Sequence, residues 1–541
     1  MLTLKRENKM MKKLVIFSFL MLFSIPNVLA ATLLQGYVYT TNPVAHSLVV
    51  VRDSLNNTLI TETDEQGFYQ LDITDFVAPL IVSSDNNKLT PMSYQENQDS
   101  ATHRVASFIN TLQPNQINTV NLNSFTDYLL SELAIELDYI GPEQLIRKGL
   151  NHPVSNQILD NITQRFHQIF DDSLQQVGIN PQHFDPMSTI DMRTNLLLAL
   201  ILHNRSYDSQ RGEIGRTVLF DMRFRPITEQ MPFDFNQATR DKNGNIKAEK
   251  RLFIVSDSTA ANYDRKVYPR MGWGQVLEQF ITEDRTMVVI NGAQSGRSSR
   301  SFYNEGWFNL MAPFMQKGDY LIIAFGHNDE KCDSSKSERG RVDVMNLCTY
   351  PNDAEQNKQY PDGREDMSFQ TSLERYIDLA KQKEMVPILM TPVTRFRNEN
   401  NHIAYQNHDL KPVVSTHFTT NKSGFRYWGN YSDTIKYTAQ QNDISLIDLE
   451  QLSINFANQH QQDWQAYWLV VDPSDKRYPY YKTQTSGVIS NPDITHFQEK
   501  GALAVAQLIV DAIKDNPNLK SLSVLLDRHT IRESNHEVLT K

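Results

Sequence analysis

The C-terminal half of the sequence predicts an α/β fold with a doubly wound parallel sheet. Short apolar runs recur there, and each suits a strand that is buried on both faces. Helical stretches lie between or after these runs, and this alternation is typical of a parallel sheet with helices on both sides. The runs are residues 252–255, 287–290, 320–324, 386–390 and 444–447, and the helical stretches are residues 274–280, 369–381, 431–441 and 497–514.

The N-terminal half follows two other patterns. Residues 31–123 hold short β-rich runs separated by turn residues, which predict a small β-sandwich. Apolar residues at helical spacing then predict a helical segment, followed by a polar linker with some extended pieces; together they span residues 124–247. A catalytic domain is expected over residues 248–541. The β-rich runs are residues 34–39, 47–52, 58–63 and 68–73, and the helical runs are residues 128–137, 158–166 and 192–201.

Length and charge restrict the function. A chain of 541 residues is expected to form two or three domains. The formal net charge of −10 argues against a nucleic-acid partner, because phosphate binding needs a basic face. No stretch after residue 30 approaches the about 20 apolar residues that span a bilayer.

The N-terminus has the pattern of a signal peptide. Basic residues between Lys5 and Lys13 precede an apolar run over residues 14–23, and Val28-Leu29-Ala30 offers a cleavage site. We therefore expect an exported protein, either periplasmic or extracellular, with no membrane contact after cleavage. Its two cysteines, Cys332 and Cys348, are expected to form a disulfide in that oxidising environment.

Four polar segments are placed where chemistry is expected. In open parallel sheets, ligands bind beyond the carboxyl ends of the strands. Three segments directly follow predicted strands, and a fourth precedes the last long helix. They are residues 256–259 (Ser-Asp-Ser-Thr), 291–300 (Asn-Gly-Ala-Gln-Ser-Gly-Arg-Ser-Ser-Arg), 325–330 (Phe-Gly-His-Asn-Asp-Glu) and 493–496 (Asp-Ile-Thr-His). We expect them to converge on one rim of the sheet.

These segments contain the parts of a serine hydrolase. Ser258 is the candidate nucleophile, and a serine hydroxyl needs a base to take its proton. His496 is the candidate base, and Asp493 could hold its ring in the required tautomer. The backbone N–H groups of Ser258 and Gly296 and the side-chain amide of Asn328 are the candidate oxyanion donors.

Other chemistries have weaker support in the sequence. It contains no Gly-x-Ser-x-Gly elbow, no Walker A or Gly-x-Gly-x-x-Gly motif and no His-Glu-x-x-His motif. His402, His408 and His417 form a loose group, but their irregular spacing favours surface or substrate-loop histidines over metal ligands. No metal and no organic cofactor are therefore expected.

Taken together and in this order, the four segments resemble the SGNH (GDSL-type) hydrolases, over roughly residues 251–514. Residues 291–298, residues 325–329 and the Gly272-Trp273-Gly274 triplet look like the rhamnogalacturonan and pectin acetylesterases of carbohydrate esterase family 12. This resemblance implies a flavodoxin-like sheet. It matches Ser258, Gly296, Asn328 and His496 to the serine, glycine, asparagine and histidine for which the SGNH family is named. Arg297 and His327 lie within these segments and are expected to bind substrate.

The sequence departs from the family pattern at one position and also contains a decoy. The usual glycine before Asp257 is Ser256, which puts the tightness of the first turn in question. Asp53-Ser54-Leu55 imitates the family motif, but it lies in the β-rich region with no helix after it, so we interpret it as part of a hairpin. The β-rich region itself resembles the carboxypeptidase-regulatory-like or transthyretin-like domains, through its Asp64-x-x-Gly67-x-Tyr69 order.

The resemblance implies an exported acetylesterase acting on acetylated pectic polysaccharide. A lipase or thioesterase on the same fold is one alternative, although the polar stretch over residues 331–366 favours a sugar substrate over a long acyl chain. Its arginines Arg339, Arg341 and Arg364 could meet galacturonate carboxylates. A carbohydrate-binding protein with a decayed site is the second alternative, and the intact Ser258, Asp493 and His496 argue against it. The β-sandwich could bind sugar, dock to secretion machinery or stabilise the enzyme.

Overall fold

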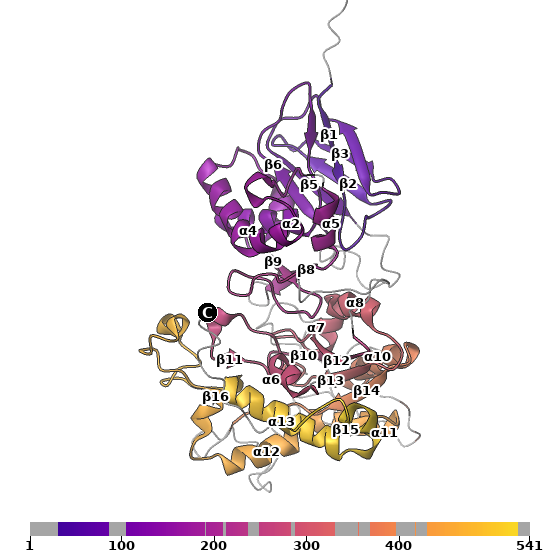
Figure 1. Cartoon of the computed structure of the whole chain (residues 1–541), viewed down its shortest axis with the longest axis vertical. Coiled ribbons are helices and arrows are strands. Elements are labelled where there is room, and N and C mark those ends of the chain that lie inside the picture. Colours follow the sequence, from indigo (N-terminus) through magenta and orange to yellow (C-terminus); the bar gives the residue numbers. More distant parts are fainter. Residues whose placement is uncertain are drawn as a thin grey trace, which may run out of the picture.

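The computed structural model describes residues 31–85, 104–189, 191–208, 213–235, 248–282, 287–330, 368–396 and 430–528, together with residues 355, 357 and 417. Figure 1 shows the N-terminal sheets and helices at one end of the molecule and the α/β part at the other, with strands β8 (Leu202–Asp208) and β9 (Glu213–Phe220) between them. Several predictions from the sequence lie outside the described residues: the signal peptide, Cys332 and Cys348, His402 and His408, and the three arginines of residues 331–366.

The N-terminal region contains two small sheets that share one hydrophobic cluster. One sheet has the order β4-β1-β7 and the other β3-β2-β5-β6. Side chains of both enter the cluster, including Leu34, Val49 and Val82. The first sheet is mixed, because β1 and β7 are parallel. The strands are β1 (Leu33–Tyr37), β2 (Leu48–Arg52), β3 (Thr58–Glu62), β4 (Phe68–Asp72), β5 (Leu80–Asp85), β6 (Ala106–Ile109) and β7 (Ile117–Thr119).

The decoy motif lies in the turn of a hairpin, as the sequence predicts. Asp53 follows β2, and its carboxylate accepts hydrogen bonds from the backbone N–H groups of Leu55 (2.9 Å) and Asn57 (2.8 Å). Asn56 has a positive φ of 68°, which asparagine tolerates better than most residues. Asp53 and Ser54 therefore shape the β2–β3 turn.

A helical segment follows the small sheets. It contains α2 (Ser124–Glu136), α3 (Pro142–Lys148), α4 (Asn156–Gln176) and α5 (Met192–Leu198). Helix α2 begins with a reciprocal capping box between Asn123 and Thr126. The stretch expected to be a polar linker with some extended pieces contains two paired strands, since β8 (Leu202–Asp208) and β9 (Glu213–Phe220) form an antiparallel hairpin. This hairpin packs against α2, so its strands are fixed by tertiary contacts that a polar sequence does not reveal.

The C-terminal region contains the predicted parallel sheet. Its order is β12-β10-β13-β14-β15, and every neighbouring pair is parallel. Counted along the chain this order is 2-1-3-4-5, that of flavodoxin-like sheets. All five predicted apolar runs form these strands: β10 (Lys250–Ser256), β12 (Met287–Asn291), β13 (Tyr320–Ala324), β14 (Val386–Met390) and β15 (Ser445–Ile447).

Alternate side chains of strand β10, which has a neighbour on each side, enter two different cores. Phe253 and Val255 of β10 join the larger hydrophobic cluster, whereas Leu252 and Ile254 join the second one. This follows from the period of two along a strand, and it explains why β10 is a continuous apolar run. The second core includes buried residues of α13 (Glu499–Asp515).

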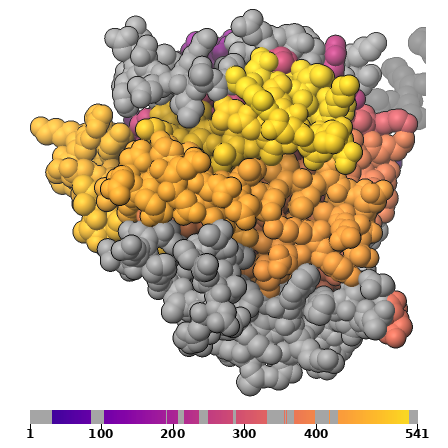
Figure 2. All heavy atoms as spheres, turned by 90° about the horizontal axis from the view of Figure 1, so that it is seen from below, coloured from indigo at the N-terminus to yellow at the C-terminus, as the bar shows by residue number. Residues whose placement is uncertain are grey.

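Helices cover both faces of the sheet. Figure 2 views the molecule from below, where orange and yellow residues of the C-terminal region form much of the visible surface. No helix among the described residues is long and apolar enough to cross a membrane. The other α-helices of this region, within the part of the chain that the structure describes, are α6 (Trp273–Val276), α7 (Ser299–Asn304), α8 (Trp307–Met311), α10 (Phe369–Gln382), α11 (Tyr431–Gln441), α12 (Leu449–Gln459) and α14 (Lys520–Ser523).

The larger hydrophobic cluster joins the helical segment to the α/β region. It contains Phe125 and Phe170 from the helices, Phe220 from β9 and Trp307 from α8. The rings of Phe220 and Trp307 meet edge to face, with 5.6 Å between their centroids. The helices and the hairpin therefore cover an apolar face of the α/β region.

This shared core predicts the behaviour of a truncated chain that begins at Ala248. Removal of the helices and the hairpin should expose Trp307 and its neighbours, and exposed apolar patches of this kind promote association. We expect the truncated chain to aggregate or to bind a hydrophobic dye, whereas the full chain should stay monodisperse in size-exclusion chromatography. A monomeric truncated chain without dye binding would show that the α/β region closes its core alone.

Candidate active site

Ser258 lies in a turn directly after strand β10 of the parallel sheet. Asp257 forms this turn, because its carboxylate accepts hydrogen bonds from the backbone N–H (2.9 Å) and the hydroxyl (2.8 Å) of Thr259. Ser256, which stands where relatives of the resembled family have glycine, is the last residue of β10, and its hydroxyl donates to the Ala324 carbonyl of neighbouring β13 (2.6 Å). The serine at position 256 is thus accommodated within the sheet.

The structure brings Ser258, His496 and Asp493 together in one hydrogen-bonded chain. Nε2 of His496 lies 2.8 Å from Oγ of Ser258, and Nδ1 lies 2.7 Å from a carboxylate oxygen of Asp493. Since a carboxylate only accepts, Nδ1 carries the proton and Nε2 presents its lone pair to the serine hydroxyl. The arrangement can therefore take a proton from Ser258.

Asp493 is held as an anion in this arrangement. Burial favours the neutral acid, but the hydrogen bond and charge of His496 and the N–H groups of Thr495 and His496 outweigh it, so the pKa of Asp493 is lowered. Its second oxygen accepts from those two N–H groups at 2.9 and 3.0 Å. The carboxylate is therefore fixed both in charge and in direction.

Asp493 and His496 lie on a short strand that the sequence does not predict. Strand β17 (Asp493–Gln498) pairs with β16 (Trp468–Leu469) and β11 (Arg270–Met271) in a separate three-stranded sheet. Helix α13 follows it, as expected from the sequence. Most side chains of β17 are only partly buried, so the strand lacks the continuous apolar pattern that identifies the main sheet.

The segment after β12 approaches the Ser258 turn closely. The N–H of Gln294 donates to the carbonyl of Ser256 (3.1 Å), and the Asn291 side chain donates to the carbonyl of Ala260 (2.6 Å). Gly274 makes this packing possible, because a Cβ there would lie 2.7 Å from the Asn291 amide. Gly296 has a φ of +78° with open space around its Cα, so its backbone conformation is what favours glycine.

The block after β13 is tied to the same segment. The side-chain amide of Asn328 donates to the carbonyl of Arg297 (3.2 Å). Asp329 accepts from both the backbone N–H (2.8 Å) and the hydroxyl (2.6 Å) of Ser299. The two loops that carry Gly296 and Asn328, the candidate oxyanion residues, are therefore bound to each other beside the Ser258 turn.

Arg297, expected from the sequence to bind substrate, is held within its own loop. Its guanidinium pairs with Glu305 (2.8 Å), donates to the carbonyl of Ser295 (2.7 Å) and lies over the Trp307 ring. A cavity of about 180 Å³ adjoins it. One side of this cavity is formed by β9 and the residues that follow it, and the loop after β12 forms part of the other side. The cavity is lined by Val218, Phe220, Phe224, Pro226, Ala261, Asn262, Ala293, Gln294, Arg297 and Trp307.

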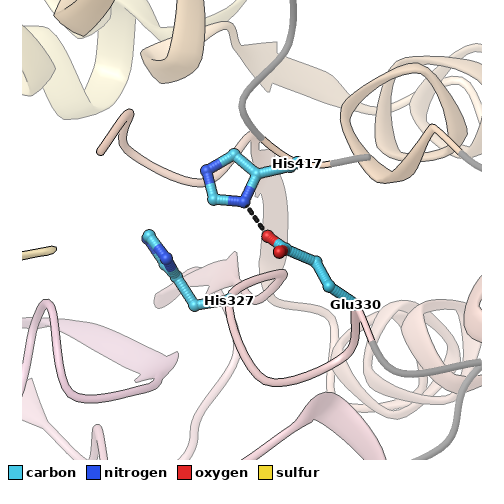
Figure 3. A group of neighbouring side chains, drawn as sticks. All are labelled: His327, Glu330 and His417. Carbon is cyan, nitrogen blue, oxygen red and sulfur yellow. Dashed lines mark hydrogen bonds and ion pairs between the residues drawn. The ribbon is translucent and has the colours of Figure 1, made fainter. Parts of the chain in front are cut away.

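His327, the other expected substrate residue, lies in a buried group with Glu330 and His417. Figure 3 shows the three side chains pointing toward one another. The rings of His327 and His417 meet at 90° with 4.5 Å between their centroids. Burial, with the nearby charges of His417, Arg395 and His496, lowers the pKa of His327 well below its usual value, so this ring is neutral at pH 7.

The expectation that His417 is a surface or substrate-loop residue is wrong. Its side chain is fully buried, and its Nδ1 pairs with Glu330. Nε2 of His417 lies 2.9 Å from the carbonyl oxygen of Val393, beyond the end of β14. Spacing along the chain could not show this, because Glu330 and Val393 are brought to His417 by the sheet.

Tyr263 is a site residue that the sequence does not reveal. Its hydroxyl donates to the carbonyl of Ser258 (2.6 Å) and lies 3.3 Å from Oγ of Ser295. The Arg270 guanidinium covers its ring at 4.4 Å. Tyr263 thus connects the turn that carries Ser258 to the loop that carries Gly296, and no motif marks it.

Comparisons with known proteins find relatives of the α/β region. Residues 252–509 match the family model described as GDSL-like lipase/acylhydrolase. These residues form a GDSL/SGNH hydrolase domain. The chain is also similar to the rhamnogalacturonan acetylesterase RhgT of Bacillus subtilis, with 29% identity over 272 residues that cover 50% of this chain and 92% of that protein. The GDSL domain is thus distantly related to rhamnogalacturonan acetylesterases.

Two further similarities are more limited. A rhamnogalacturonan acetylesterase of Emericella nidulans is 36% identical over 92 residues, which cover 17% of this chain and 33% of that protein. The crystal structure of protein YXIM from Bacillus subtilis superposes with a TM-score of 0.32 and 20% identity, over 58% of this chain and 73% of that one. The GDSL domain carries Ser258, Gly296, Asn328, Asp493 and His496 within its matched residues.

Asp329 predicts a pH dependence of stability. Burial raises the pKa of this carboxyl to about 7, above its ordinary value near 4. A raised folded-state pKa contributes stability that is fully present below about pH 4 and is lost as pH rises toward 7. In Asp329→Asn this loss should be absent, so urea unfolding should show a smaller fall in the free energy of unfolding between pH 4 and 7 than in the parent chain. An equal fall in the free energy of unfolding for both proteins would contradict the raised pKa of Asp329.

Proposed function

We propose that the chain is an exported serine esterase that removes acetyl groups from pectic polysaccharide. The hydrogen-bonded chain from Ser258 through His496 to Asp493, at the carboxyl end of strand β10, is the observation that carries the esterase mechanism. The distant relation to rhamnogalacturonan acetylesterases supports acetate as the acid and a pectic sugar as the alcohol. The basic and apolar pattern of the first 30 residues supports export.

In the first step, Oγ of Ser258 attacks the ester carbonyl while its proton moves to Nε2 of His496. Asp493 stabilises the imidazolium that forms, through the bond to Nδ1. The tetrahedral intermediate then collapses, and the C–O bond to the sugar breaks. Nε2 returns its proton to the departing sugar oxygen, which leaves an acetyl group on Ser258.

In the second step, water attacks the acetyl group and gives its proton to Nε2 of His496. The bond to Oγ breaks, the serine recovers the proton, and acetate is released. The negative oxygen of both tetrahedral intermediates needs hydrogen-bond donors. We assign this role to the N–H groups of Ser258 and Gly296 and to the side-chain amide of Asn328, since their loops are bound together beside the nucleophile.

The three residues should act as one unit in kinetics. Ser258→Ala should lower kcat/KM for p-nitrophenyl acetate by at least about 10³-fold with an unchanged melting temperature. His496→Ala should cost about as much, and Asp493→Asn should favour the wrong tautomer. The Asp493→Asn/His496→Ala double variant should lose little more than the worse single variant.

Ser54→Ala is the matched control for the nucleophile. Ser54 follows an aspartate as Ser258 does, but it lies in the β2–β3 turn, so its substitution should leave activity unchanged. If Ser258→Ala kept a tenth of the activity, or if the losses at Asp493 and His496 were strictly additive, the proposed mechanism would be wrong.

The substrate is tested by acyl-chain length and by polysaccharide. A small acyl pocket should give falling kcat/KM from p-nitrophenyl acetate through butyrate to octanoate, whereas a lipase gains up to about 0.8 kcal/mol for each buried methylene. Acetate should be released from acetylated pectin, and the Ser258→Ala variant should release none. Rising kcat/KM toward octanoate with no acetate from pectin would indicate a lipase. Binding to pectin without hydrolysis of any ester would indicate a carbohydrate-binding protein.

A further inference from the structure

His327, Glu330 and His417 form a compact set of possible metal ligands. One ligand atom from each side chain can be chosen so that all three lie within 4.8 Å of one another. A tetrahedral zinc ion holds nitrogen and oxygen ligands at about 2.0–2.2 Å, which places the ligand atoms about 3.3–3.6 Å from each other. Side-chain rotations that bring the three atoms about 1 Å closer together would therefore place them around one ion.

The hydrogen bonds of His417 fix which ring nitrogen faces Glu330 as a possible ligand. Nε2 lies 2.9 Å from the Val393 carbonyl, which only accepts, so Nε2 carries a proton. In the neutral ring, Nδ1 then presents a lone pair to the Glu330 carboxylate. Two acceptors that face each other need a cation between them, either a proton or a metal ion.

His327 distinguishes between these two cations. Its side chain is only 7% exposed, and among the described residues neither ring nitrogen has a hydrogen-bond partner of normal geometry. A buried polar group without a partner is costly. A proton shared by His417 and Glu330 would satisfy those two residues alone, whereas a metal ion would satisfy all three.

The surroundings resemble the outer shell of metal sites. A histidine ligand commonly donates its other N–H to a backbone carbonyl, as His417 does to Val393. Arg395 lies 3.2 Å from one carboxylate oxygen of Glu330 and orients it, although its charge opposes a cation. Two nitrogen donors and one oxygen donor favour Zn²⁺ over Ca²⁺ or Mg²⁺, which prefer oxygen ligands.

From these contacts we propose that His327, Glu330 and His417 bind a zinc ion. Three protein ligands leave one tetrahedral position for water or another oxygen ligand. The site lies next to the catalytic residues, since the N–H of Phe396, in the segment that carries Val393, donates to the carbonyl of Ile494 on β17 (2.9 Å). The proposal concerns metal binding and is independent of the acetylesterase activity.

Metal retention by the full-length, untagged chain tests the proposal. Protein stripped with EDTA is loaded with ZnCl2, passed through a desalting column and analysed by mass spectrometry for zinc. We expect about one zinc per chain and a raised melting temperature. Loading with Co²⁺ in place of zinc should give visible absorption bands, a readout that does not depend on activity.

Matched variants identify the ligands. His327→Gln and Glu330→Gln should each weaken zinc binding by more than about 10-fold. His460→Gln is the matched control, because it removes a histidine that lies outside the proposed site and pairs with Asp463 at the surface. This variant should retain zinc as the parent does. Ser258→Ala should also retain it. A parent chain without bound zinc or cobalt, or His327→Gln and Glu330→Gln variants that bind zinc as well as the parent, would overturn the proposal.

Discussion

The functional region depends on one constraint, the meeting of parallel strands at their carboxyl ends. Strand β10 lies between β12 and β13. The next strand along the chain, β12, pairs on one side of β10 and the following strand, β13, pairs on the other, so the strand order reverses at β10. Ligand crevices of open α/β sheets form at this point. Ser258, Gly296 and Asn328 each follow one of these three strands and are gathered there by the sheet, although 70 residues separate the first from the last.

Short hydrogen bonds then hold the gathered loops in place. Asp257 shapes the turn of Ser258, Asp329 holds the start of α7 through Ser299, and Tyr263 connects the two loops that carry Ser258 and Gly296. Asp257 and Asp329 are buried, where the loss of these hydrogen bonds would be costly. The catalytic hydroxyl therefore lies on a turn whose geometry is determined by several strands at once.

The sequence predicted the main sheet, and with it the position of Ser258 at the end of a strand, because both leave local patterns. A strand buried on both faces is a continuous apolar run, and residues that follow such runs are placed by topology. Strand β17 left no such pattern, since it is short and only partly buried. The hairpin β8–β9 was hidden for a related reason, because its pairing depends on α2 and its polar sequence resembles a linker.

His417 illustrates a different limit of sequence interpretation. In the sequence, His417 was grouped with the histidines at positions 402 and 408 because the three lie close together along the chain. The structure instead pairs it with Glu330, 87 positions away, and with the Val393 carbonyl. Burial of a single histidine is decided by tertiary contacts, which leave no period in the sequence.

The cavity beside Arg297 has a consequence for how this protein can diversify. Part of its wall comes from β9 and the residues that follow it, outside the GDSL domain, and the rest comes from the loops after β10 and β12 and from Trp307 of α8. Asn262 joins the two sides by donating to the carbonyls of Phe224 and Asn291. Mutations upstream of the GDSL domain can thus reshape the surroundings of its loops while the nucleophile and its base remain unchanged. A chain with a different upstream segment would then present a different cavity wall beside the same loops.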